Sequence, residues 1–384
     1  MTEPPSIRPP GVFVREISFR PGSIALGRSD VAGFVGFTAT APSHGVGESI
    51  GAQPHAVSSR SEFESLFGGP AGDRVLPHAV AGFFENGGRR AYIARIPDPA
   101  LPAPPYTGVE AAARAIDALL AVDEVSVLAF PDLVNVAGTG DGDVDRAMWR
   151  AMQVAMIAKC EERGDVIAIL DSPPGMSASE IAELRQTASH DTAFAALFYP
   201  WLKIADGGTA TRQVPPSGHV AGVWARTEAT RGVWKAPANE AVRGVLGLGA
   251  AISDADQSVL NPLGINAIRT FPSRGILVWG ARTLSSDASW TFVNIRRLLS
   301  AIEKAIAAAA QPTSTEPVAQ RLTTLVGQAE NFLTDLWRQG AFQGARAEDA
   351  FFVRSSSTAG DSSLQIGVAP LRPAEFVIVR IEVS

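Results

Sequence analysis

The strongest constraint on the fold is an alternation of apolar runs with helical segments over residues 109–200. The segments are, in order, a helical pattern over 109–121, an apolar run at 125–130, a helical stretch over 146–163, an apolar run at 166–170, a helix opened by Ser177 and Glu180, and a run at 194–199 closed by Pro200. Short apolar runs between helices are typical of buried parallel strands, because helices cover both faces of such a sheet. This stretch therefore predicts a βαβαβ unit and an α/β fold.

Further elements are expected on both sides of this unit. Upstream, the sequence predicts strands over 31–37 and 90–96, a helix beginning at Ser61 between them, and a proline-rich joint at 97–105. Downstream, Asp287 can cap a long helix whose apolar residues recur at spacings of three and four, and a second helix is expected over 317–338. The last third therefore reads as an α+β region.

Each end of the chain carries a short strand that is isolated from the other elements. The first lies at 11–17, and the second is the alternating stretch 375–383. Such a strand can pair within its own domain or add to the exposed edge of a neighbour. Periodicity alone favours pairing within the same chain.

Composition excludes several classes of protein. Lys and Arg number 33 against 39 Asp and Glu, so the net charge of −6 gives no electrostatic basis for binding nucleic acid. The lone Cys160 cannot form an intrachain disulfide, and no apolar run approaches the roughly 18 residues of a membrane span. The N-terminus has no signal-peptide pattern, so we expect the product to be made and folded in the cytosol.

The sequence contains no recognisable catalytic or ligand-binding motif. The nucleophile elbow, the Walker A pattern and His-Glu-x-x-His are all absent, and the five histidines lack the spacing of metal ligands. The loop at 138–145 lacks the Gly and Glu that a calcium loop requires, and the glycines at 244–249 lack the dinucleotide-binding spacing. A triad of His219, Asp171 and a serine remains conceivable, so an α/β hydrolase is the alternative function.

Seven segments carry longer and more specific motifs. They are PGVFVREI at 10–17, PSGHVAGVWART at 216–227, GVWKAPAN at 232–239, LNPLGIN at 260–266, VWGARTLSSD at 278–287, VNIRR at 293–297 and PLRPAEFV at 370–377. Together they closely resemble the tail sheath proteins of contractile phages and related injection machines. The resemblance spans both termini and the last 170 residues.

The resemblance implies a fold and a division of the chain. We expect a mixed sheet with βαβ units, in a core of the kind described as subtilisin-like in this family, followed by a C-terminal α+β sheath domain. The implied parts are an N-terminal arm at 1–24, an N-terminal and central region at 25–215, a C-terminal domain at 216–370 and a C-terminal strand at 371–384.

The resemblance also implies a structural role without catalytic, cofactor-binding or metal-binding residues. Subunits of the family polymerise around an inner tube and contract from a metastable extended state without using nucleotide. The implied partners are other sheath subunits, the inner tube protein, and baseplate and tail terminator or cap proteins, with no nucleic acid and no direct membrane insertion. The particle is a phage tail or a released injection system.

Three sets of residues follow from the resemblance. Terminal strands donated to neighbours would contain Val12, Phe13, Val14, Arg15, Ile17, Phe376, Val377, Ile378, Val379, Arg380 and Ile381. Donation would reverse the preference for pairing within the chain. Arg282, Asp287, Arg296 and Arg297 would hold the start of the long helix and the strand before it, while Glu330 and Arg338 would face the tube.

Overall fold

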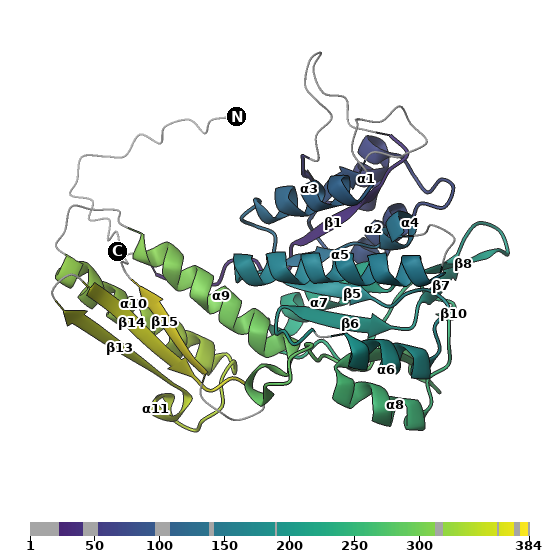
Figure 1. Ribbon diagram of the computed structural model, residues 1–384. Helices are drawn as coiled ribbons and strands as arrows, with labels where there is room; N and C mark the ends of the chain where they lie inside the picture. The colour runs from purple at the N-terminus through teal and green to yellow at the C-terminus, as the bar shows by residue number, and fades with distance from the viewer. Residues whose placement is uncertain are drawn as a thin grey trace, which may run out of the picture.

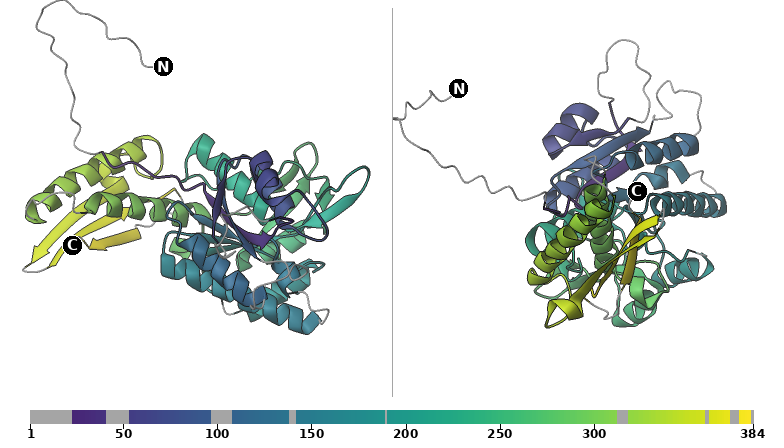
Figure 2. Two further views of the ribbon diagram at one scale, coloured as in Figure 1. Left: turned by 90° about the horizontal axis from the view of Figure 1, so that it is seen from above. Right: turned by 90° about the vertical axis from the view of Figure 1, so that its left-hand side faces the viewer.

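A computed structural model shows an α/β part and a smaller C-terminal part that stands at one end of it, with helix α9 running between them (Figures 1 and 2). The structure describes residues 23–40, 53–96, 108–137, 142–188, 190–311, 318–358, 361–371 and 377–382. The proline-rich joint expected at 97–105 lies outside these residues, as does most of the N-terminal arm.

The α/β part is built on one mixed sheet of nine strands. Their order is β2 (His55–Val57), β3 (Ala91–Ile96), β1 (Ala32–Phe37), β4 (Val127–Ala129), β5 (Ile167–Asp171), β6 (Ala195–Tyr199), β11 (Ile265–Phe271), β12 (Gly275–Val278) and β9 (Glu240–Ala241). The six strands from β3 to β11 are parallel, and β2, β12 and β9 pair antiparallel at the two edges. The predicted α/β fold with βαβ units is confirmed.

Helices cover both faces of this sheet. One face carries α3 (Gly108–Leu120), α5 (Gly142–Arg163), α6 (Ala178–Thr187) and α8 (Asp254–Leu260), and the other carries α1 (Arg60–Phe67), α2 (Leu76–Glu85) and α7 (Ser217–Arg231). The central strands are therefore buried on both sides: Phe34 of β1 packs with the second set of helices and Val35 with the first. This double burial explains why these strands read as continuous apolar runs.

Two helix starts show how local sequence fixes the elements. Ser177 and Glu180 form a capping box at α6, as the sequence predicts. The helix expected from Ser61 begins one residue earlier, because Ser59 is the cap and accepts a hydrogen bond from the amide of Glu62.

Helices α2 and α7 lie in backbone contact. A β-carbon added at Gly218 would lie 2.3 Å from the carbonyl oxygen of Ala79, and one at Gly222 would lie 2.3 Å from that of Phe83. The two glycines, spaced four residues apart, therefore form the face of α7 that meets α2.

The remaining elements are short or belong to the C-terminal part. The short ones are α4 (Leu133–Ala137), β7 (Leu202–Ala205), β8 (Thr211–Val214), β10 (Gly247–Leu248), and the 3₁₀ turns η1 (Asn261–Leu263) and η2 (Ala288–Trp290); strands β10, β7 and β8 form a separate antiparallel sheet. The C-terminal part contains α9 (Val293–Ala310), α10 (Val318–Arg338), α11 (Ala347–Ala350), β13 (Phe351–Thr358), β14 (Asp361–Val368) and β15 (Val377–Glu382).

The nine-stranded sheet extends across the domain boundary expected at residue 216. Strand β11 pairs in parallel with β6, and α7 packs on α2, so the elements from Ser217 to Val278 belong to the nine-stranded sheet and its helices. The C-terminal part therefore begins only after β12.

Candidate functional site: the terminal sheet and the joint at α9

The C-terminal sheet is ordered β13-β14-β15, and both pairings are antiparallel. Ile366 in the central strand lies opposite Val353 of β13 and opposite Val379 of β15. Leu364 and Ile366 are fully buried in a core that they share with α9 and α10. Within the described residues, the outer edge of β13 pairs with no strand, so it presents free main-chain donors and acceptors.

The predicted strand arms are placed only in part. Val377, Ile378, Val379, Arg380 and Ile381 lie in β15, which pairs with β14 of the same chain; Phe376 and the N-terminal set Val12, Phe13, Val14, Arg15 and Ile17 lie outside the described residues. Pairing within the chain is what periodicity alone favours. Because the structure is that of one chain, it does not test donation, which stays a prediction.

Asp287 caps a different element from the one predicted. Its Oδ1 accepts a hydrogen bond from the amide of Ser289 at 2.8 Å, at the start of η2, whereas α9 begins only at Val293. The helix cannot start earlier because Phe292 is extended (φ −111°, ψ 135°) and forms a β-bridge with Arg282. The guanidinium of Arg282 lies over the Phe292 ring, 5.7 Å from its centroid.

Arg296 joins α9 to the α/β part through aromatic rings. Its guanidinium lies 4.5 Å from the ring centroid of Trp290 and 4.8 Å from that of Phe194, which precedes β6. It also donates hydrogen bonds to Ser300 and Glu303, at 3.1 and 3.0 Å. Burial lowers the pKa of Arg296 and raises that of Glu303; the guanidinium remains protonated, and its charge favours ionisation of the Glu303 carboxylate.

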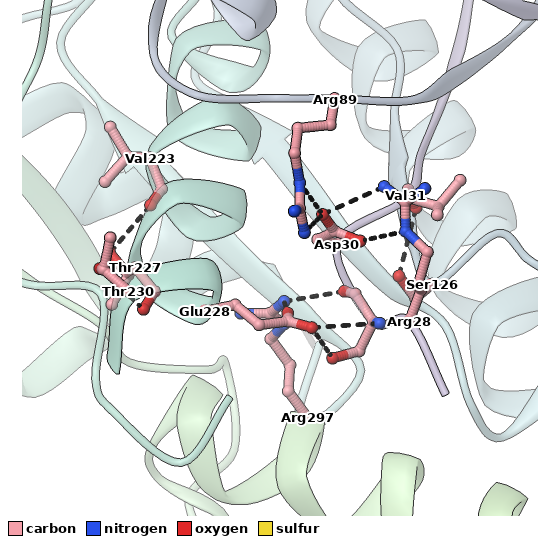
Figure 3. A network of polar contacts seen from close by, with 11 residues as sticks. Arg28, Asp30, Val31, Arg89, Ser126, Val223, Thr227, Glu228, Thr230 and Arg297 are labelled. Atoms are coloured by element: carbon pink, nitrogen blue, oxygen red, sulfur yellow. Dashed lines mark hydrogen bonds and ion pairs between the residues drawn. The ribbon is translucent and has the colours of Figure 1, made fainter. Parts of the chain in front are cut away.

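Arg297 joins α9 to α7 and to the segment before β1 (Figure 3). Its Nη2 donates to Oε2 of Glu228 at 2.6 Å and to the backbone carbonyl of Ser29 at 2.8 Å. Glu228 in turn accepts hydrogen bonds from the amide and the hydroxyl of Ser29, at 3.2 and 2.7 Å. The Arg297 side chain is only 4% exposed and lies over the ring of Trp224, so this contact is almost entirely screened from water.

Asp30 continues the polar network (Figure 3). Its carboxylate is 1% exposed and pairs with Arg28 at 2.8 Å and with Arg89 at 3.0 Å. Burial alone would raise the pKa of Asp30, but the hydrogen bonds from the two arginines outweigh it, and the pKa lies below its ordinary value. The carboxylate therefore stays ionised. Sequence analysis missed Ser29, Asp30 and Glu228, because their partners are up to 268 residues away and no local pattern marks them.

The residues predicted to face the tube lie on α10. Glu330 and Arg338 are both exposed, and Arg338 pairs only loosely with Asp335, at 3.4 Å. Exposed charges on a helix face are compatible with a partner surface and with solvent alike. Their contact with a tube stays a prediction.

The conceivable catalytic triad is not assembled. Oδ1 of Asp171 accepts a hydrogen bond from the amide of Ser217 at 2.8 Å, but the ring of His219 packs against Gly82 on α2. All three side chains are buried, and burial raises the pKa of Asp171 to about 7 and lowers that of His219 to about 4. A buried histidine that packs against a neighbouring helix cannot meet a substrate, so this cluster serves packing.

In the part of the chain that the structure describes, no group of three or more His, Cys, Asp or Glu side chains is arranged to hold a metal ion. Among those same residues, no helix combines the length and apolar character needed to cross a bilayer.

Comparison with known proteins agrees with this architecture. The model of the phage tail sheath protein central domain matches residues 110–284, and that of the phage tail sheath C-terminal domain matches 285–384. A prophage tail sheath protein of Pseudomonas aeruginosa (strain UCBPP-PA14) is 29% identical over 235 residues, which is 58% of this chain and 59% of that protein. The chain thus spans less than two thirds of the length of this curated relative.

Solved structures match over nearly the whole chain. A chain of the anti-feeding prophage (AFP) helical sheath in its contracted state is 30% identical, with a TM-score of 0.73 and coverage of 98% of this chain and 99% of that one. A chain of the AFP baseplate structure is 28% identical, with the same TM-score and coverages. A chain of the contracted sheath complex of PVC, an extracellular contractile injection system, is 27% identical, with a TM-score of 0.72 and 98% of each chain covered.

The chain belongs to the phage tail sheath family. It is a contractile sheath subunit of a phage tail or an extracellular contractile injection system, and the family is structural rather than enzymatic. The resemblance identified from the sequence is therefore confirmed. The family models divide the chain after residue 284, close to where the nine-stranded sheet ends.

Proposed function

We propose that subunits of this chain polymerise into a cylinder around an inner tube, held together by exchanged terminal strands. Contraction of the cylinder from a metastable extended state then drives the tube through a target envelope. Baseplate and tail terminator or cap proteins would bound the cylinder, and assembly would take place in the bacterial cytoplasm. Glu330 and Arg338 would contact the tube through weak, salt-sensitive pairs.

The observation that carries this proposal is the arrangement of the C-terminal sheet. Strand β15 follows residues 372–376, and among the described residues it pairs only with β14, at the edge of a three-stranded sheet. A strand at an edge can be replaced by the same strand of a neighbour, with the same six register pairs from Ser363–Glu382 to Val368–Val377. The outer edge of β13 offers a second edge at which a neighbour's strand could pair, and the strand predicted at 12–17 would occupy it.

Removal of each arm tests the proposal. One chain would start at Ser23 and another would end at Leu371, and circular dichroism, sedimentation and negative-stain electron microscopy would compare both with the full chain. We expect folded monomers that build no cylinders, because a subunit without an arm has no strand with which to link to its neighbour. If both truncated chains still build cylinders, the strand exchange is wrong; if both unfold, the strands belong to their own subunit.

Point variants in β15 sharpen this test. Val379→Pro removes one main-chain donor, and Ile378→Pro removes the donor on the opposite edge, because alternate residues of an antiparallel strand point their amides to opposite sides. Val379→Ala is the matched control, since it shortens the same side chain and keeps the amide. We expect at least one proline variant to abolish polymerisation and the alanine variant to retain it.

A further inference from the structure

The chain changes from exposed to buried immediately before β1. Residues 23–28 are exposed or half-buried and border a cavity of about 660 Å³ beside α9, whereas Ser29, Asp30 and Val31 are buried. Ile24 and Leu26 pack, partly buried, against the core of the C-terminal part, and full burial of the segment begins at Ser29.

Ser29 is held by both parts of the subunit at once. Its amide and hydroxyl donate to Glu228 of α7, while its carbonyl accepts from Arg297 of α9. The ion pair between Glu228 and Arg297, at 2.6 Å, closes the triangle. One residue of the segment thus links the α/β part to the helix that leads into the C-terminal part.

The next residue adds an independent attachment. Asp30 pairs with Arg89, which lies before β3, and with its neighbour Arg28, and the carbonyl of Val31 accepts a hydrogen bond from the hydroxyl of Ser126. Because the Asp30 carboxylate and the Arg297 guanidinium are almost completely buried, these pairs are screened little by salt, and breaking one leaves an unpaired buried charge. The contacts also act on consecutive residues, so a pull along the chain loads them together.

We propose that residues 28–30 form a load-bearing anchor for the N-terminal arm. Tension from a neighbour that holds the arm would be passed through Ser29 to α7 and α9, and through Asp30 to Arg89, before it reaches β1. The anchor rests on the proposed function, because only a donated arm carries tension. It goes further by identifying the residues that receive the load.

The test compares Glu228→Gln and Ser29→Ala with the unaltered full chain. Glu228→Gln removes the charge that holds both Ser29 and Arg297, and Ser29→Ala removes only the hydroxyl, which keeps the test usable if the first variant folds poorly. Glu64→Gln is the matched control, because its pair with Arg60 is exposed and lies on α1. The first readout is the rate of trypsin cleavage between Arg28 and Ser29, measured by mass spectrometry; the second is cylinder length after a fixed shear, measured by electron microscopy.

We expect cleavage to accelerate about tenfold in Glu228→Gln, less in Ser29→Ala, and not at all in Glu64→Gln, because cleavage requires local opening of the anchor. Both anchor variants should still build cylinders, but these should break into shorter pieces under shear. Unchanged cleavage, or faster cleavage with unchanged cylinder lengths, would overturn the anchor. Failure of the unaltered chain to build cylinders would contradict the proposed function itself, which separates the two failures.

Discussion

Gly222→Ala probes the backbone contact between α7 and α2. The added β-carbon would lie 2.3 Å from the carbonyl oxygen of Phe83 and 2.7 Å from the β-carbon of Asn86, whereas real β-carbons keep at least 3.0 Å. The helices must therefore separate by more than half an ångström, since a backbone carbonyl cannot rotate away. Separation loosens the packing of Phe83 and Trp224, which are fully buried. Overpacking of this kind costs up to about 3 kcal/mol, and alanine returns about 1 kcal/mol of helix propensity, so we expect a net loss of about 2 kcal/mol.

Gly327→Ala in α10 is the matched control. The same substitution there meets no atom within 4 Å, so only the propensity gain of about 1 kcal/mol remains. Thermal unfolding followed by circular dichroism, at a protein concentration where the chain is monomeric, should lower the Tm for Gly222→Ala and raise it slightly for Gly327→Ala. Equal shifts for the two variants would refute the claim that α7 and α2 are held at backbone distance.

Three other predictions concern single contacts. Arg296→Met should cost about 2 kcal/mol because it leaves Glu303 unpaired and half-buried, and adding Glu303→Gln should recover part of that loss in a double-mutant cycle. Asp287→Ala should cost at most about 1 kcal/mol in thermal unfolding, because the cap it removes is exposed. Burial raises the pKa of Asp171 to about 7, so between about pH 4 and 7 the native state keeps a proton that the unfolded state loses. The free energy of unfolding therefore falls as pH rises through that window. Asp171→Asn should flatten this pH dependence of the Tm.

Local sequence patterns predicted the elements more successfully than their assembly. The strands over 31–37 and 166–170 were predictable because burial on both faces makes them continuously apolar. The pairing of β11 with β6 across residue 216 could not be predicted, because it joins segments about 70 residues apart and no local period records such a pairing. Asp132 is a similar case: it accepts hydrogen bonds from the amides of Val75 and Leu76 at the start of α2, from 57 and 56 residues away.

Of the contacts between α9 and the α/β part, only the residues on α9 could be predicted from the sequence. Arg296 and Arg297 stand out in the motif at 293–297, but the sequence does not show that one meets aromatic rings and the other meets Glu228 and Ser29. Long side chains at the start of a helix can reach several neighbours, and the neighbour is chosen by how the helix docks on the sheet. Docking is a property of the assembled core, so its polar contacts were beyond reach of spacing rules.

The C-terminal sheet also bears on what would drive polymerisation. In the single chain, β15 already pairs with β14, and an exchange with a neighbour forms the same register pairs between subunits. The hydrogen bonds of that ladder therefore cancel between monomer and polymer, as they do in domain swapping generally. A net gain in the free energy of polymerisation must come from contacts that the monomer lacks. The outer edge of β13 pairs with no strand in the described chain, so the N-terminal strand of a neighbour can form such new contacts there. On this reasoning, loss of the segment at 12–17 should raise the protein concentration needed for polymerisation more than Val379→Ala does.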